Sequence, residues 1–251
     1  MSTTNLSPPL TPIKELAESL RDDGFAVLAA EDVAHIVGMP LDRLMELNQF
    51  WEALPRDPYL KDGGRYRFRR HSSFEVKGEA LAIVPHRAHW QSVNYNALHG
   101  GIERWFEPSQ VQLTTSPVWQ SLLLGLVKVL NGVKPVTTWF IEAHQFRIDT
   151  TDGIGRPTPE GAHRDGVDFV AVFLLNRVSI KGGETRIFEA GGSAGLRFTL
   201  TEPWSLLLMN DERMIHESTP IQPLGSHGYR DTLVLTFRSN GFQDSPSRSQ
   251  Q

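Results

Sequence analysis

The chain has 251 residues, which is long enough for one large domain with a substantial buried core. It contains no cysteine, so disulfides and thiolate metal sites are excluded, and any metal must be bound through nitrogen and oxygen. The formal net charge of −4 gives no overall field that would attract nucleic acid or an anionic membrane, and no apolar run approaches the about 18 residues of a membrane span. Residues 1–5 carry neither a charged leader nor an apolar stretch, so we expect a cytoplasmic protein.

The first third of the chain predicts helices around one short strand. Residues 1–10 are polar and rich in proline, which is typical of a loose terminus. Thr11 and Pro12 resemble a helix cap followed by proline at the first helical position, and apolar residues then recur at helical spacing. A short buried strand over 25–28 and a second helix over about 40–54 follow. The apolar stripes of these helices indicate core packing.

A basic segment at residues 65–71 alternates arginine with aromatic residues and leaves three interpretations open. It could bind nucleic acid, although the acidic net charge disfavours this. It could bind a carboxylate of a small molecule through the guanidinium fork, which makes Arg67 a candidate substrate contact. It could also be a solvated edge strand protected by its charge. Farther along, polar and aromatic residues mix over 85–107, including Tyr95 and Asn96, and such a segment suits a loop that covers a site.

The second half of the chain changes character. A helix is predicted to begin at Ser116 and Pro117 and to end near Asn131 and Gly132. Short apolar or alternating runs follow, separated by Gly, Pro, Asn and Asp, and this spacing favours a sandwich or a barrel. The predicted strands span residues 137–148, 168–178, 184–189, 196–200, 204–210, 213–218 and 229–238.

These patterns predict a single domain over residues 1–251. After the loose terminus, residues 11–135 form an N-terminal helical and lid region. Residues 136–241 form the β-rich catalytic core. The polar tail, residues 242–251, is expected to be disordered.

The pattern His163-x-Asp165 lies in the predicted core. On an extended backbone the imidazole and the carboxylate point to the same face. His216 follows about four strands later, on another predicted strand. A set of two histidines and one carboxylate with open coordination positions is the signature of non-haem iron(II) oxygenases. An isolated His-x-Asp is a weak pattern and a lone histidine is usually structural. A hydrolytic zinc enzyme could use the same ligands, but the helical H-E-x-x-H motif is absent.

Arg230 and Thr232 share one face of the last predicted strand. An arginine beside a hydroxyl can hold the far carboxylate of a dicarboxylic cofactor by charge-assisted hydrogen bonds. The order His-x-Asp, distal His and Arg-x-Thr resembles the 2-oxoglutarate/iron(II)-dependent dioxygenases. Further segments resemble one branch of that family, the bacterial free-amino-acid hydroxylases typified by L-isoleucine dioxygenase. These segments are residues 95–96, 144–147, 158–170, 182–185 and 211–216.

The resemblance covers roughly residues 60–238 and is most specific after residue 136. It implies a fold that is mainly β with α, a double-stranded β-helix (jelly-roll, cupin-like) core with an N-terminal helical layer. It implies Fe(II) as cofactor, with 2-oxoglutarate and O2 as co-substrates. The implied reaction hydroxylates an unactivated C–H of a free L-amino acid and converts 2-oxoglutarate to succinate and CO2. The implied iron ligands are His163, Asp165 and His216, and the implied cofactor-binding residues are Arg230, Thr232 and Gln145.

Residues that contact the substrate are less defined by the pattern. Gln145 and Arg147 share one face of the first core strand. If both point inward, Arg147 suits a carboxylate of the substrate or of 2-oxoglutarate; otherwise it is an outward arginine in a salt bridge. Glu160 could bind a substrate ammonium or stabilise the turn before the metal ligands. Arg67, Tyr95 and Asn96 are the remaining candidates.

Two other functions remain open from the sequence. The protein could hydroxylate a peptide or a carrier-bound amino acid, although we find no accessory domain for a larger target. It could instead be a non-catalytic jelly-roll protein that binds or senses a ligand. The complete ligand set together with Arg230 argues against the second alternative.

Overall fold

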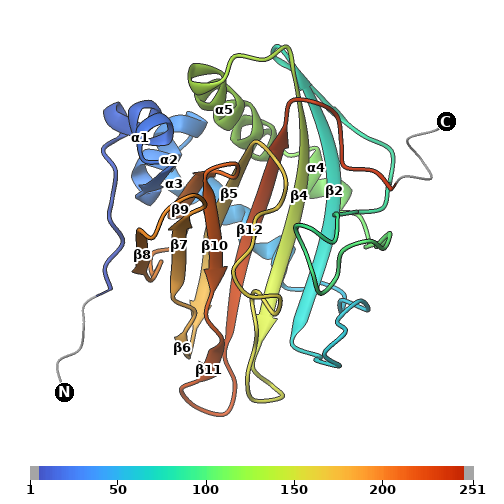
Figure 1. The fold of residues 1–251 in the computed structure, drawn as a ribbon. Helices are drawn as coiled ribbons and strands as arrows, with labels where there is room; N and C mark the ends of the chain where they lie inside the picture. The colour runs from blue at the N-terminus through green and yellow to red at the C-terminus, as the bar shows by residue number, and fades with distance from the viewer. Residues whose placement is uncertain (1–5, 246–251) are drawn as a thin grey trace.

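The computed structural model describes residues 6–245 of the chain. Within this range the chain forms twelve strands, and nine of them lie after residue 137 (Figure 1). The strands are β1 (Phe25–Leu28), β2 (Arg67–Lys77), β3 (Ala80–Ile83), β4 (Thr138–Asp149), β5 (Phe169–Val178), β6 (Ile180–Gly182), β7 (Thr185–Glu189), β8 (Gly195–Phe198), β9 (Leu206–Asn210), β10 (Met214–Ser218), β11 (Ile221–Pro223) and β12 (Tyr229–Arg238).

One seven-stranded sheet dominates the molecule, in the order β1-β9-β5-β12-β4-β2-β3. A second sheet has the order β10-β7-β8, and β11 pairs with β6. The pairs are antiparallel, and the long strands β12, β4 and β2 stand side by side in Figure 1. This is a jelly-roll-like double-stranded β-helix core, so the predicted fold class is confirmed. The seven strands predicted after residue 136 correspond to β4, β5, β7, β8, β9, β10 and β12, whereas β6 and β11 were not predicted.

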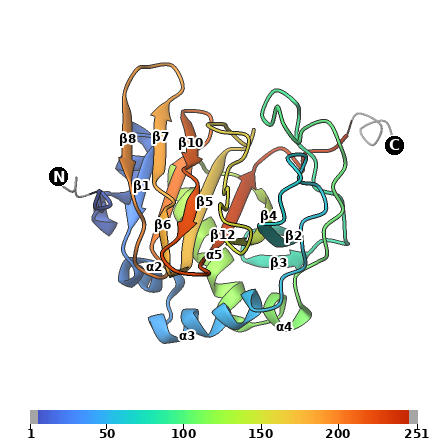
Figure 2. The same ribbon diagram turned by 90° about the horizontal axis from the view of Figure 1, so that it is seen from below.

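The helices gather on one side of the large sheet, away from the small sheet (Figure 2). The helix predicted over 40–54 is a short α-helix that continues as a 3-10 helix, and the helix at 30–37 was not predicted. Proline occupies the first turn of the longest helix, as expected from its fixed backbone angle. The elements are η1 (Ile13–Glu15), α1 (Leu16–Asp22), α2 (Ala30–Val37), α3 (Leu41–Met45), η2 (Glu46–Trp51), α4 (Val111–Thr114) and α5 (Pro117–Val133).

The two faces of the large sheet have different partners because side chains alternate along each strand. The outer face presents residues such as Ile141 of β4 and Leu233 of β12, which pack against the buried side of α5. On the inner face, Leu174 of β5 packs against Ile187 of β7 and Phe198 of β8. This second core closes one end of the space between the sheets. The other end is lined by polar side chains and holds the site described below.

Strand β2 has a different environment from a solvated edge strand. It pairs with β4 along its whole length and with β3 over Phe74–Lys77, and a bridge between Arg56 and Phe68 covers the other edge of its basic part. Arg67, Arg69 and His71 are each less than 5% exposed. The interpretation as a solvated edge strand is therefore wrong, because these alternate side chains point into the protein interior.

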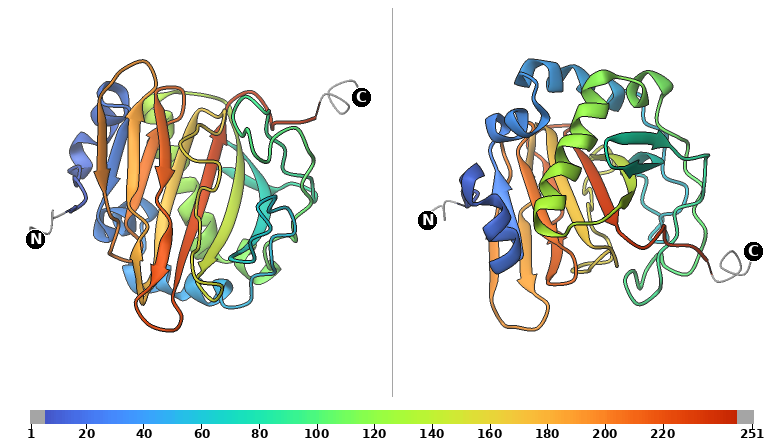
Figure 3. Two further views of the ribbon diagram at one scale, coloured as in Figure 1. Left: turned by 60° about the horizontal axis from the view of Figure 1, so that its bottom comes forward. Right: turned by 90° about the horizontal axis from the view of Figure 1, so that it is seen from above.

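The segment between β3 and α4, here called the lid (residues 84–110), has little regular structure. It lies beside β2 and β4, on the far side of the molecule from the β7–β8 hairpin (Figure 3). The outer parts of the predicted loose terminus and disordered tail, residues 1–5 and 246–251, lie outside the described range. None of the helices between residues 6 and 245 combines the length and the apolar character that crossing a membrane requires.

Candidate metal centre

Three side chains converge where β10 meets the segment before β5. His163 and His216 form an antiparallel bridge, with backbone N–O distances of 3.0 and 2.9 Å, and their ring centroids are 4.6 Å apart. Asp165 Oδ1 lies 3.8 Å from His163 Nε2, and its Oδ2 lies 3.7 Å from His216 Nε2. One donor atom from each residue lies within 4.8 Å of the others. This convergence suits a single cation with bonds of about 2 Å.

The protonation chemistry of this triad also suits a cation. His163 Nδ1 donates to the carbonyl of Gly161 at 2.9 Å, which leaves Nε2 free as a ligand atom. Burial disfavours the charged form of His163, but the carboxylates of Asp165 and Glu160 raise its pKa. Burial and the neighbouring His163 lower the pKa of His216 to about 3, so this imidazole is neutral. A metal ion would replace the proton that the carboxylates attract.

The loop that carries Asp165 is held by a residue that the sequence analysis did not select. Both carboxylate oxygens of Asp211 accept backbone N–H groups, from Asp165 at 3.0 Å, Gly166 at 2.7 Å and Val167 at 3.0 Å. Gly166 has φ of 77°, and a Cβ there would lie 2.5 Å from the Tyr95 ring, so only glycine fits. The signal was present, because Asp211 begins the segment that ends at His216, which was predicted as an iron ligand.

A cavity of about 110 Å³ opens from the triad toward the inner face of the large sheet. Arg230 lines it, is 4% exposed, and forms no ion pair within the described part of the chain. Burial and the nearby Arg177 lower the pKa of Arg230 to about 10, so it remains charged at neutral pH. A buried cation without a partner is costly unless an anion binds it. The cavity therefore fits a carboxylate at Arg230, with Thr232 on the same strand face.

Five residues predicted from the sequence as cofactor or substrate contacts line this cavity with the triad: Arg67, Asn96, Glu160, Arg230 and Thr232. The lid contributes further side chains that the sequence analysis left unassigned. These lid residues are His89, Gln91 and Arg104.

Three other predicted contacts lie outside the cavity lining. On β4 the inward residues are His144, Phe146 and Ile148, so Gln145 and Arg147 point to the opposite face. Gln145 donates to the carbonyl of Phe50. The inward placement of both residues is therefore wrong.

Arg147 forms the outward salt bridge that was the alternative interpretation. Its guanidinium makes two bonds of 2.7 Å to Asp231 and lies over the Tyr229 ring. Tyr95 packs against Gly166, outside the cavity lining, because the missing side chain of the glycine leaves room for its ring.

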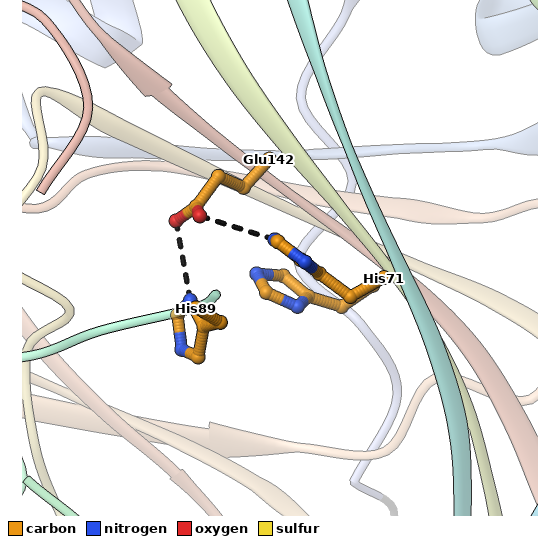
Figure 4. A group of neighbouring side chains, drawn as sticks. His71, His89 and Glu142 are labelled. Carbon is orange, nitrogen blue, oxygen red and sulfur yellow. Dashed lines mark hydrogen bonds and ion pairs between the residues drawn. The ribbon is translucent and has the colours of Figure 1, made fainter. Parts of the chain in front are cut away.

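A second group of histidines and a carboxylate lies behind the cavity wall. Glu142 of β4 accepts His71 Nε2–H at 3.1 Å and His89 Nδ1–H at 3.2 Å (Figure 4). Arg87 from the lid approaches the same carboxylate at 3.4 Å. Burial opposes ionisation of Glu142, but His89 and His71 hold its pKa well below the usual range. His144 completes the group, and Arg69 Nη2 donates to its Nδ1 at 2.7 Å.

This second group does not fit a metal ion. Arginine has only donors, so His144 Nδ1 must accept and its lone pair is occupied. Glu142 already receives donors from three side chains, and the adjacent guanidinium groups of Arg69 and Arg87 repel a cation. The network instead fastens the lid residues Arg87 and His89 to the sheet. Its members come from separate segments, so no sequence spacing could identify it.

The comparisons with known proteins agree with this geometry. The model of the 2OG-Fe dioxygenase family matches residues 48–236, and the chain therefore belongs to this family. It is a non-haem iron enzyme of the class that uses Fe(II), 2-oxoglutarate and O2.

Solved structures extend the likeness over almost the whole chain. A BsmA homologue from Methylobium petroleophilum PM1 is 48% identical, with a TM-score of 0.90 over 97% of this chain and 100% of that one. IDO from Bacillus thuringiensis is 18% identical, with a TM-score of 0.74 over 96% and 99% of the two chains. The Fe(II)/α-ketoglutarate-dependent dioxygenase TqaL is 19% identical, with a TM-score of 0.69 over 90% and 86%. The last two show a shared fold. No curated protein sequence matches the chain.

Proposed function

We propose that the protein hydroxylates an unactivated C–H of a free L-amino acid while it converts 2-oxoglutarate to succinate and CO2. In this proposal His163, Asp165 and His216 hold the iron(II). Arg230 binds the distal carboxylate of 2-oxoglutarate, and Thr232 supports it from the same strand face. The bound iron supplies the oxygen activation, whereas the protein positions both organic molecules and limits access of water.

The observation that carries the substrate class is the distribution of charge around the cavity. Glu160 Oε2 is buried and has no hydrogen-bond partner among the described residues, although Glu160 lines the cavity. Arg104 lines the same cavity, and its buried guanidinium forms no ion pair among the described residues. A free amino acid carries one ammonium and one carboxylate, and it would satisfy both groups. An internal residue of a peptide has neither charge.

The contacts of Glu160 support its assignment to the ammonium. Its Oε1 lies 3.6 Å from His163 Nε2, and Asn96 Nδ2 approaches that oxygen at 3.5 Å. The other oxygen is therefore the one available to a ligand. Buried carboxylates are stable only when they are paired, so an arriving ammonium would relieve the cost of this burial. The same position brings the carbons of the ligand close to the metal ligands.

The test is a panel of free L-amino acids supplied with iron(II), ascorbate and 2-oxoglutarate and read by mass spectrometry. We expect succinate together with a product heavier by one oxygen atom for at least one amino acid. Hydroxylation only of peptides or carrier-bound residues would overturn the proposed substrate class. Tight binding of amino acids without turnover would overturn the hydroxylase and favour a binding protein.

A further inference from the structure

The lid residue Gln91 makes direct contact with the metal-binding carboxylate. Its Nε2 donates to Asp165 Oδ1 at 2.9 Å, and its Oε1 accepts from Arg104 Nη2 at 2.9 Å. Arginine can only donate and a carboxylate can only accept, so the orientation of the amide is dictated by its two partners. Asn96 Nδ2 adds a third contact, to Oε1 at 3.3 Å. Gln91 is 6% exposed, so these bonds are protected from competing water.

Arg104, like Arg230, is a buried arginine of the cavity that forms no ion pair among the described residues. It is 2% exposed, its Nε has no partner among the described residues, and its one side-chain bond goes to the neutral Gln91. Arg67, in the same cavity, differs because its Nε binds Asp57 at 2.7 Å. Burial and the nearby Arg67 lower the pKa of Arg104 to about 10, which leaves it charged at neutral pH. The surplus positive charge thus faces the cavity.

We propose that Arg104 binds the carboxylate of the substrate and that Gln91 is a positioning residue that joins Arg104 to the metal ligand Asp165. This inference rests on the proposed function for the identity of the anion. One amide then spans the substrate anchor and the metal ligand. Gln91 binds Oδ1 of Asp165, and Oδ2, which lies 3.7 Å from His216 Nε2, would remain available to a metal. Metal binding and substrate binding share the same lid residue.

The arrangement explains why the lid must be fixed to the sheet. Arg104 and His89 exchange backbone hydrogen bonds of 2.9 Å in both directions, so the strand-like part of the lid holds both residues in register. His89 in turn donates to the buried Glu142. If the lid moved by about one ångström, both ends of the Gln91 amide would be misplaced. Hydrogen bonds that orient a metal ligand tolerate little displacement.

The first experiment titrates the protein with Co(II) alone and follows the visible absorption of the bound ion. Loss of a hydrogen bond to a metal ligand typically weakens binding by about 10–100-fold. We expect that weakening in Gln91→Leu and no change in Arg65→Met, because Arg65 forms an exposed ion pair with Asp152 outside the cavity. Gln91→Asn, whose amide is too short to span both partners, should show the same weakening and serves if the leucine variant does not fold. Wild-type affinity in a folded Gln91 variant would overturn the positioning role.

The second experiment examines Arg104→Met in steady-state kinetics and in thermal unfolding. The KM for the amino acid should rise by about 10–100-fold, as expected for the loss of charge-assisted hydrogen bonds, whereas the KM for 2-oxoglutarate should not change. The Tm should be unchanged or higher, because the variant removes a buried charge that has no partner. An unchanged KM for the amino acid, or a lower Tm, would overturn the anchor role of Arg104.

The two failures can be told apart. If no free amino acid is hydroxylated, the proposed function fails in the wild-type protein before any variant is made. The Co(II) titration still decides the role of Gln91, and the Tm of Arg104→Met still decides whether Arg104 is a structural residue.

Discussion

Two groups of histidines and carboxylates lie close together in this protein, yet only one suits a metal ion. His163, Asp165 and His216 present donor atoms that meet at one point on the cavity. His71 and His89 each donate one ring N–H to the carboxylate of Glu142. In the second group the carboxylate is contacted by two imidazoles and an arginine. The composition of a cluster is therefore a weaker guide to metal binding than the atoms that remain free.

The triad and the Glu142 network also differ in their expected roles, which are catalysis and stability. The triad places the carboxylate of Asp165 between two imidazoles, and a bound metal ion would stabilise it. The Glu142 network pairs its carboxylate with groups of the protein and connects the lid residues Arg87 and His89 to the sheet. Substitutions in the triad should therefore reduce metal binding and turnover, whereas substitutions in the Glu142 network should reduce stability.

The largest effect is expected from removal of a metal ligand. His163→Ala or Asp165→Ala should reduce turnover by more than the about 10–100-fold that accompanies loss of an outer contact, because the ligand itself is gone. The circular dichroism spectrum should remain that of the folded protein. The matched variant His71→Ala should lower the Tm but retain Co(II) binding. Turnover at the wild-type rate in Asp165→Ala would contradict the ligand set.

Removal of Glu142 should act mainly on stability. Breaking a buried ion pair from one side costs about 3–5 kcal/mol, since His71, His89 and Arg87 would lose their common acceptor. Denaturant unfolding of Glu142→Ala should show a loss of this size, with a smaller loss in Glu142→Gln, which retains an acceptor oxygen. The affinity for Co(II) should be unchanged. Loss of one Co(II) equivalent would instead show that the Glu142 network binds metal.

Arg230 and Arg147 offer a matched pair on adjacent strands that point to opposite faces. Hydrogen bonds to charged groups contribute about 1.5–3 kcal/mol, so Arg230→Ala should raise the KM for 2-oxoglutarate by about 10–100-fold. Arg147→Ala should leave that KM unchanged and lower the stability, because Asp231 would lose its partner. Steady-state kinetics at saturating amino acid distinguish the two. A raised KM for 2-oxoglutarate in Arg147→Ala, with no change in Arg230→Ala, would indicate that Arg147 binds the co-substrate.

The smallest effect concerns pH. Burial lowers the pKa of His89 to about 4, whereas the unfolded chain binds that proton near pH 6.5. The unfolded state therefore binds more protons between these values, and the free energy of unfolding should fall as the pH is lowered through this window. We expect a loss of about 1–2 kcal/mol from His89 between pH 6.5 and 5. Unfolding curves of His89→Gln should show a shallower dependence on pH, and an unchanged slope would remove His89 from this account.

Much of the site could be predicted because its residues lie in short, characteristic segments. The spacing of His163 and Asp165 places both side chains on one face of an extended segment. His216 and Arg230 were selected from their predicted strands, and the resemblance supported both. The face to which β4 directs its residues was not predictable. Residues 144–147 of β4 do not alternate regularly between polar and apolar types. The sequence pattern therefore does not show which face points inward. Packing of the opposite face against α5 decides it.

The class of fold, the family and the chemical type of the expected metal ligands could be inferred from the sequence, because these depend on local periodicity and on short motifs. The pairing of charges within the protein became visible in the three-dimensional arrangement. Glu142 is matched by donors from β2 and from the lid, whereas Glu160 Oε2 and the Arg104 guanidinium line the cavity without an ion partner between residues 6 and 245. Compensation depends on distances of a few ångströms between segments far apart in the chain, and no spacing along the sequence encodes those distances.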